Sequence, residues 1–227
     1  MKKKHSLQNN ILYILLLFIL IGCVAPINTT FESAKLLNKG GIELQGSYSK
    51  YRFIEDVEES ISANANYGVA IGYGVSDRYS IKLRYEKVNS SFGNLDIDEG
   101  EEGLSDAFDY NYIEFTNKFS LWEDRIAFSI PISAYLNDIQ SFYQIDPRFF
   151  FTFGQGDHFD FTIIPKAHFI FFDGDTYVTP ALSLGIGLSS DLSKWAIRPE
   201  VGFDSYFVYG IGFSYYLNNK EKNSNRY

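Results

Sequence analysis

From residue 41 onward, apolar and polar residues alternate with a period of two over most of the chain. In residues 79–86, every odd-numbered position is apolar and every even-numbered position is polar. This is the pattern of a β-strand with one apolar face. It predicts an all-β, antiparallel, up-and-down barrel of about ten strands, with eight or twelve as alternatives. The predicted strands are residues 41–52, 63–75, 77–88, 109–120, 125–135, 143–154, 159–172, 176–188, 194–203 and 206–217.

The predicted strands and loops have lengths that suit a barrel crossing a membrane. Many strands approach the roughly 9–11 residues that a tilted transmembrane strand needs. Connections at residues 76, 121–124, 155–158 and 189–193 are short, whereas those at 53–62 and 89–108 are long. Transmembrane barrels join their strands by short turns at one end and long loops at the other. We therefore predict a transmembrane barrel with extracellular long loops, and an even strand count that returns the C-terminus to the periplasm.

Alternation alone fits two barrels of opposite polarity. A soluble barrel turns its apolar face inward, whereas a membrane barrel turns it toward lipid and fills its lumen with polar groups. The apolar face here is rich in aromatic residues, as membrane interfaces favour, so the membrane polarity is the better fit. The predicted lumen charge network then consists of Glu43, Lys82, Arg84, Glu86, Glu114, Lys118, Asp146, Arg148, Lys166, Arg198 and Glu200.

Two groups of residues depart from this simple pattern. One is a set of apolar residues on the predicted lumen face, namely Phe150, Ile164, Ile170 and Phe172. The other is a set of prolines inside predicted strands, where a ladder hydrogen bond is lost and a bulge or a strand break is expected. These are Pro131, Pro147, Pro165, Pro180 and Pro199.

The first 23 residues have a different organisation. Lysines at positions 2–4 precede an apolar run at residues 11–21, which is too short to span a bilayer and is typical of a secretory signal. The run ends in Leu20-Ile21-Gly22-Cys23, which resembles the lipobox of bacterial lipoprotein precursors. The resemblance implies cleavage before Cys23 and acylation of its sulfur and new amino group, and Val24 permits export to the outer membrane.

The rest of the chain also resembles small outer-membrane β-barrel proteins, in its opening segment at residues 31–44 and its closing strand at 209–217. We interpret residues 1–22 as a lipoprotein signal peptide, 23–40 as a lipidated tether, 41–217 as the barrel and 218–227 as a polar tail. The resemblance implies an outer-membrane protein, lipid-anchored through Cys23, with a periplasmic N-terminus. The polar tail departs from the terminal aromatic residue with which such barrels often end.

Charge and candidate chemistry argue against several other functions. The formal net charge is −8, and removal of the signal peptide would take away three lysines, so a nucleic-acid partner is not expected. His158 is predicted in a turn and His168 on the lumen face, and no serine is tied to either by a catalytic motif. The acidic loops 53–62 and 89–108 lack the spacing of a calcium site and are interpreted as solvated. We predict no enzymatic activity, no metal and no cofactor.

These observations predict a non-enzymatic outer-membrane barrel lipoprotein with a structural, surface-interaction or narrow transport role. One alternative is a lipid-anchored soluble periplasmic barrel that binds an apolar ligand. A second is a lipid-modifying outer-membrane enzyme. The expected partners are outer-membrane lipids and the machineries that process lipoproteins and assemble barrels, and the sequence identifies no protein partner.

Overall fold

The computed structural model describes residues 27–53, 64–90, 108–137, 141–154, 157–204 and 206–219. Cys23, the expected signal peptide, most of the two acidic loops and most of the polar tail lie outside these ranges, so what the sequence predicts for them stays a prediction. Within them, no helix is long and apolar enough to cross a membrane.

The described chain is a single β-sheet with one short 3-10 helix, η1 (Glu123–Arg125). Its strands are β1 (Ile42–Phe53), β2 (Asn64–Ser76), β3 (Tyr79–Ser90), β4 (Phe108–Trp122), β5 (Ile126–Ser129), β6 (Ile132–Leu136), β7 (Ser141–Ile145), β8 (Arg148–Phe153), β9 (Phe159–Phe172), β10 (Asp175–Leu188), β11 (Trp195–Phe203) and β12 (Tyr206–Leu217).

Two of the ten barrel strands are each split in two by a proline. β5 and β6 both pair with β4 in one continuous register, on either side of Ile130 and Pro131. β7 and β8 both pair with β9 in the same way, on either side of Asp146 and Pro147. Proline has no N–H to donate to the ladder, so the strand is interrupted there without a change of direction. The expected strand breaks are confirmed at Pro131 and Pro147.

The other three prolines lie inside unbroken strands, which corrects the expectation of a bulge or break at every proline. Pro165 in β9 is paired with Leu182, Pro180 in β10 with Ala167, and Pro199 in β11 with Ile211. The neighbouring pairs hold the register in each case, so one missing donor is tolerated.

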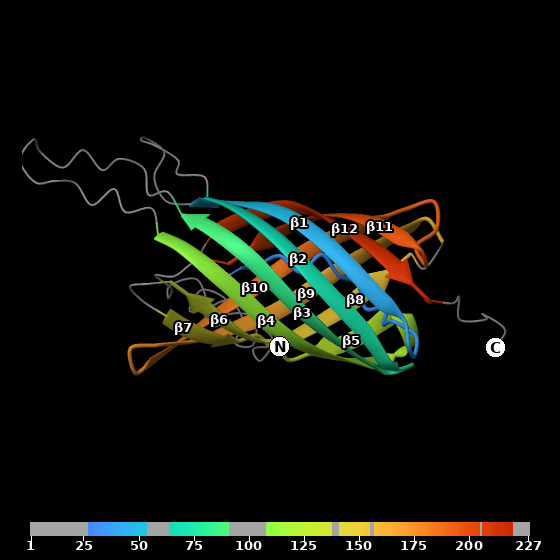
Figure 1. Cartoon of the computed structure of the whole chain (residues 1–227), viewed down its shortest axis with the longest axis horizontal. Helices are drawn as coiled ribbons and strands as arrows, with labels where there is room; N and C mark the ends of the chain where they lie inside the picture. Colours follow the sequence, from blue (N-terminus) through green and yellow to red (C-terminus); the bar gives the residue numbers. More distant parts are fainter. Residues whose placement is uncertain are drawn as a thin grey trace, which may run out of the picture.

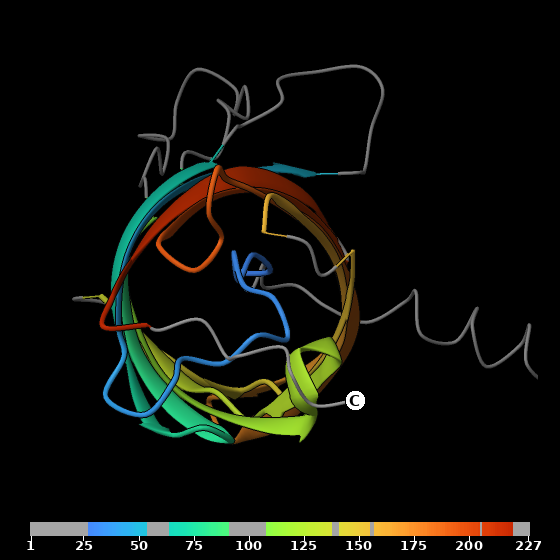
Figure 2. The same cartoon turned by 90° about the vertical axis from the view of Figure 1, so that its right-hand side faces the viewer.

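All strand pairs are antiparallel, and the sheet closes on itself. The first and last strands pair along their whole length, from Ile42 with Leu217 to Phe53 with Tyr206, while β9 pairs with β10 on the opposite side. The views in Figure 1 and Figure 2 show the resulting cylinder from the side and from one end. A closed sheet has no free edge to pair with another chain. The predicted fold, an antiparallel barrel of ten strands, is confirmed.

The two ends of the barrel differ. At one end, called the short-turn mouth below, lie the turns at residues 77–78, 123–125 and 189–194, the end of β8 and the start of β9, together with the start of β1 and the end of β12. At the other end, called the long-loop mouth below, β1, β3, β6, β9 and β11 end and β2, β4, β7, β10 and β12 begin, and the turn at residues 173–174 joins β9 to β10. One short turn is held by Asp191, which accepts hydrogen bonds from Ser193 Oγ (2.5 Å) and pairs with Lys194 (2.7 Å). These contacts, that of Lys194 foremost, hold the pKa of Asp191 below its usual range.

The barrel wall carries apolar side chains outside and charged side chains inside. On β3, Leu83 is 50% exposed, whereas Arg84 beside it is 2% exposed. Aromatic pairs line the outer surface, including Tyr79 with Phe119 and Phe128 with Phe149, each with ring centroids 4.8 Å apart. This is the polarity predicted for a membrane barrel and the reverse of a soluble one.

Candidate functional site: the lumen and the segment inside it

Residues 27–38, called the lumen segment below, run through the interior of the barrel. Figure 2 shows them as the blue chain inside the ring of strands. Residues 27–34 are all less than a tenth exposed. The sequence analysis assigned residues 23–40 to a tether and did not predict that most of them lie in the lumen.

A tight turn connects the lumen segment to β1. Gly40 has a φ of +78°, and its N–H donates to Gly74 O on β2 at 2.8 Å. A Cβ on Gly74 would lie 1.9 Å from Asn38 O, a distance that no contact permits. A glycine at position 74 therefore lets the chain fold back against the wall as it passes from the lumen into the first strand.

Because the lumen segment has no strand partner, side chains of the wall accept its backbone N–H groups. Ile27 N donates to Tyr135 Oη at 2.6 Å, and Asn28 N donates to Tyr51 Oη at 3.1 Å. Further along, Thr30 N and Phe31 N both donate to the carboxylate of Glu200, at 2.8 and 2.5 Å. Ala34 N donates to Thr152 Oγ1 at 2.7 Å.

The carbonyl groups of the segment are bound in the same manner by donors from the wall. Arg84 Nη1 donates to Thr29 O at 2.6 Å, and Lys118 Nζ donates to Ser33 O at 2.6 Å. Gln45 Nε2 donates to Phe31 O at 3.0 Å. Asn28 O accepts from Lys166 Nζ and, at 2.6 Å, from Ser183 Oγ. The barrel thus recognises the backbone of this segment as a binding site recognises an extended peptide.

One acidic side chain of the segment completes the charge balance near the short-turn mouth. Glu32 pairs with Lys118 at 2.7 Å and with Lys82 at 3.1 Å. Lys82 also pairs with Glu43 on β1 at 2.6 Å. Buried charges are costly unless they are paired, so the two lysines require this carboxylate inside the barrel.

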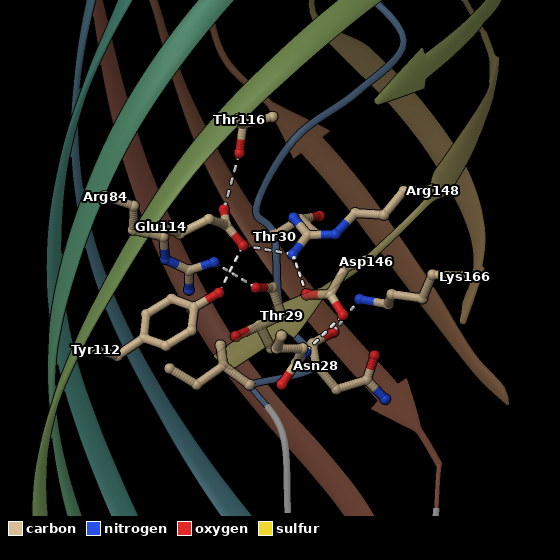
Figure 3. Close-up of polar contacts among 12 residues, drawn as sticks. Asn28, Thr29, Thr30, Arg84, Tyr112, Glu114, Thr116, Asp146, Arg148 and Lys166 are labelled. Carbon is tan, nitrogen blue, oxygen red and sulfur yellow. Dashed lines mark hydrogen bonds and ion pairs between the residues drawn. The ribbon is translucent and has the colours of Figure 1, made fainter. Parts of the chain in front are cut away.

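Charges of the wall pair with one another in the middle of the lumen, as Figure 3 shows. Arg148 contacts Glu114 at 2.5 Å and Asp146 at 3.1 Å. Glu114 also accepts from Tyr112 Oη at 2.6 Å, and Arg84 pairs with Glu86 two residues along β3. The contact of Arg148 with Glu114 joins β4 to the broken β7/β8 strand across the interior.

All eleven side chains of the predicted lumen network lie in the interior, each less than a tenth exposed. Wall charges pair with one another around Lys82, Arg84 and Arg148. Lys166 and Glu200 instead hold the lumen segment, and Arg198 pairs with Asp160 at 2.7 Å. The sequence analysis missed Asp160, although it has the same parity along β9 as Lys166 and could have been found from that signal. Glu32 gave no signal, because it lies outside the alternating pattern.

The two histidines within the described ranges, His158 and His168, occupy the places that the sequence predicted. His168 lies in the lumen, where Nδ1 is 2.6 Å from Asp146 Oδ1 and 2.8 Å from Gln144 Nε2. His158 is exposed in the turn between β8 and β9. Among the residues that the structure describes, no group of three His, Cys, Asp or Glu is arranged to hold a metal ion.

The apolar residues that break the pattern on the lumen face pack around the lumen segment. Phe150 and Ile164 form a buried cluster with Ala34 and Leu36 of the segment and with Ala127. Ile170 belongs to a second cluster around Ile27, and Phe172 packs against that cluster. The apolar side chains on the lumen face of the wall therefore pack in the same buried clusters as the apolar residues of the segment.

Glycines on β12 leave space for the largest side chain of the segment. A Cβ on Gly210 would lie 2.8 Å from the Phe31 ring, and one on Gly212 would lie 2.6 Å from Phe31 Cβ. Nearer the short-turn mouth, a cavity lined by Glu32, Leu37 and Lys82 has a volume of about 30 Å³, which is room for about one water molecule. The segment thus fills this part of the lumen closely.

No family model matches the chain, and no curated protein matches it. Solved structures of barrels are similar to it in outline. The N-terminal β-barrel domain of Pseudomonas aeruginosa OprF has 10% identity over 79% of this chain and 98% of that one, with a TM-score of 0.34. The translocator domain of autotransporter NalP from Neisseria meningitidis has 10% identity over 93% and 95%, with a TM-score of 0.42.

The outer membrane protein OprG from Pseudomonas aeruginosa has 10% identity over 82% of this chain and 99% of that one, with a TM-score of 0.33. Since these three TM-scores are below 0.5, the likeness adds nothing to the fold that the strand pairing itself shows. The strand pairing and the side chains define the class: an antiparallel ten-stranded barrel of the outer-membrane type. Within that class, this chain is a barrel whose lumen holds a segment of the same chain.

Proposed function

We propose that this protein spans the bacterial outer membrane as a closed barrel with a structural or surface-interaction role and no enzymatic activity. The outer wall supports the location, because it exposes large apolar side chains such as Val69 (62%), Ile71 (52%) and Phe153 (54%). Apolar surface of this extent is unfavourable in water and favourable in lipid. The proposal places the long loops on the extracellular side.

The occupied lumen is the observation that carries the proposed role. Transport needs a continuous path, and here the segment from Ile27 to Asn38 runs through the interior with its backbone bound to the wall. A soluble carrier of apolar ligands needs an apolar interior, whereas this one holds paired charges. Of the roles left open by the sequence, a structural or surface-interaction role therefore fits best.

The lipid anchor is a further part of the proposal. The lipobox ending in Cys23 supports acylation at that residue, and several acyl chains would give stable attachment, which a single chain does not. The partners are then outer-membrane lipids and the machineries that process lipoproteins and assemble barrels. Mass spectrometry of the mature protein should find acyl mass on Cys23, and an unmodified thiol there would contradict the anchor.

Planar-bilayer recording tests the closed lumen. Purified protein whose gel migration shifts on heating, a sign of a folded barrel, should give little steady conductance. Glu32→Lys should increase conductance, because it puts a third cation beside Lys82 and Lys118 and repels the segment. Glu123→Lys makes the same charge change at an exposed turn and should show as little steady conductance as the unaltered protein. Large, stable, ohmic channels from the unaltered protein would contradict the proposal.

A further inference from the structure

The lumen segment crosses the barrel in one direction. At the short-turn mouth, Asn38 N donates to Asn219 Oδ1, just beyond the end of β12, at 3.1 Å. Ala34 is bound by Thr152, one residue before β8 ends at the same mouth. Thr30 and Phe31 are bound by Glu200, which lies within β11. Residues closer to the N-terminal end of the segment therefore lie farther from the short-turn mouth.

The described N-terminal end of the segment lies near the long-loop mouth. Asn28 N donates to Tyr51, two residues before β1 ends at that mouth, and Ile27 N donates to Tyr135, one residue before β6 ends there. Ile27 is 1% exposed within a cluster that includes Tyr112, Phe142 and Val208. Tyr177 and Phe172, which flank the turn at 173–174, pack against this cluster.

A return of the chain to the short-turn mouth would need a second passage through the same interior. The interior beside the segment is already filled by the Glu32, Lys82 and Lys118 ion pairs and by the Ala34 and Phe150 cluster. The cavity lined by Glu32, Leu37 and Lys82, beside the segment, has a volume of about 30 Å³ and is far too small for a peptide chain. Packing thus favours an exit of the chain before Ile27 through the long-loop mouth, which is the nearer one.

We propose that the chain leaves the barrel through the long-loop mouth, so that the N-terminus of the mature protein lies on the same side of the membrane as the long loops. The proposal rests on the membrane-spanning barrel proposed above. Cys23 precedes Ile27 by four residues, which reach at most about 14 Å when fully extended. Acyl chains on Cys23 would accordingly enter the leaflet on the long-loop side. Extracellular long loops and a periplasmic N-terminus, both expected from the sequence, cannot then hold together.

Cysteine labelling on intact cells tests this topology without assuming which mouth faces outward. Three variants of the full chain each gain one cysteine: Ala25→Cys before the lumen segment, Asp175→Cys beside the long-loop mouth, and Arg78→Cys at the short-turn mouth. Asp175 and Arg78 are both exposed. Each variant is treated with a membrane-impermeant maleimide before and after the outer membrane is permeabilised. The unaltered chain gives the background, and any labelling of a free Cys23 would report the same side as Ala25→Cys.

The proposal predicts that Ala25→Cys behaves like Asp175→Cys and unlike Arg78→Cys. If the long loops are extracellular, Ala25→Cys and Asp175→Cys are labelled on intact cells, whereas Arg78→Cys is labelled only after the outer membrane is permeabilised. Labelling of Ala25→Cys together with Arg78→Cys, or protection of Ala25→Cys both before and after permeabilisation, would overturn the inference. Equal labelling of Asp175→Cys and Arg78→Cys on intact cells would instead overturn the membrane-spanning barrel itself.

Discussion

Arg84 connects the barrel wall to the lumen segment. Its guanidinium pairs with Glu86 on β3, donates to Thr29 O at 2.6 Å, and lies 5.8 Å from the centre of the Phe31 ring. Arg84 is 2% exposed. If its side chain were removed, Glu86 and the Thr29 carbonyl group would therefore have little water to bind instead.

Replacing Arg84 should therefore destabilise the barrel strongly. Arg84→Ala leaves the Glu86 carboxylate buried without its cationic partner and with a hydrogen bond from Ser47 Oγ. Removal of one member of a buried ion pair costs on the order of 3–5 kcal/mol. Tyr85→Phe changes the adjacent position on the outer surface, where the side chain is 43% exposed, and should change stability little. The stability of each variant is measured as the midpoint of its unfolding in urea, with the heat-dependent gel shift as the readout of the folded barrel. Equal midpoints for the two variants would show that the lumen charges contribute little.

Single residues also show how far the sequence could predict the site. Parity along each strand placed all eleven charged residues in the interior, because a period of two depends only on which face a residue occupies. Parity could not predict the pairing partners, since several of them belong to the lumen segment. The contact between Glu32 and Lys118, for example, joins residues 86 positions apart in the chain. Nothing in the residues around Glu32 marks it as an ion-pair partner.

At the scale of elements, eight of the ten predicted strands each correspond to one observed strand, and the strands predicted at 125–135 and 143–154 are each observed as two, with boundaries that differ by a few residues. Strand length and turn position follow from local alternation, so they could be predicted from the sequence. The lumen segment could not be predicted in this way. It forms no strand or helix, and its amides are bound by side chains from distant elements, such as Tyr135 for Ile27. Its sequence alone therefore reads as an unstructured linker.

The turn between the lumen segment and β1 gives a matched pair of glycine substitutions. Gly74→Ala should destabilise the barrel by about 1–3 kcal/mol, because the added methyl group meets the backbone oxygen of Asn38 and the chain must shift. Gly46→Ala on β1 adds the same methyl group where nothing lies within 4 Å. Alanine is also the better strand residue, so Gly46→Ala should be neutral or slightly stabilising. Urea midpoints compare the two, and a loss of stability in both would point to the strands instead of the turn.

At the scale of the whole molecule, the barrel closes around its own N-terminal region. The segment is continuous with β1, and β1 pairs with β12 at the point where the sheet closes. The closed barrel exposes apolar residues on its outside, and it encloses paired charges and the lumen segment. Residues 27–38 are held by the wall and do not form a free tether.

Hydrogen–deuterium exchange of the folded protein in detergent tests that claim most directly. Peptides covering residues 27–34 report the amides of Ile27, Asn28, Thr30, Phe31 and Ala34, each of which donates to a wall side chain. Their exchange should be slow, comparable with that of the strands, and should become fast in the Glu32→Lys variant. Exchange of residues 27–34 at the rate of an unfolded chain, while the strands stay protected, would contradict the account.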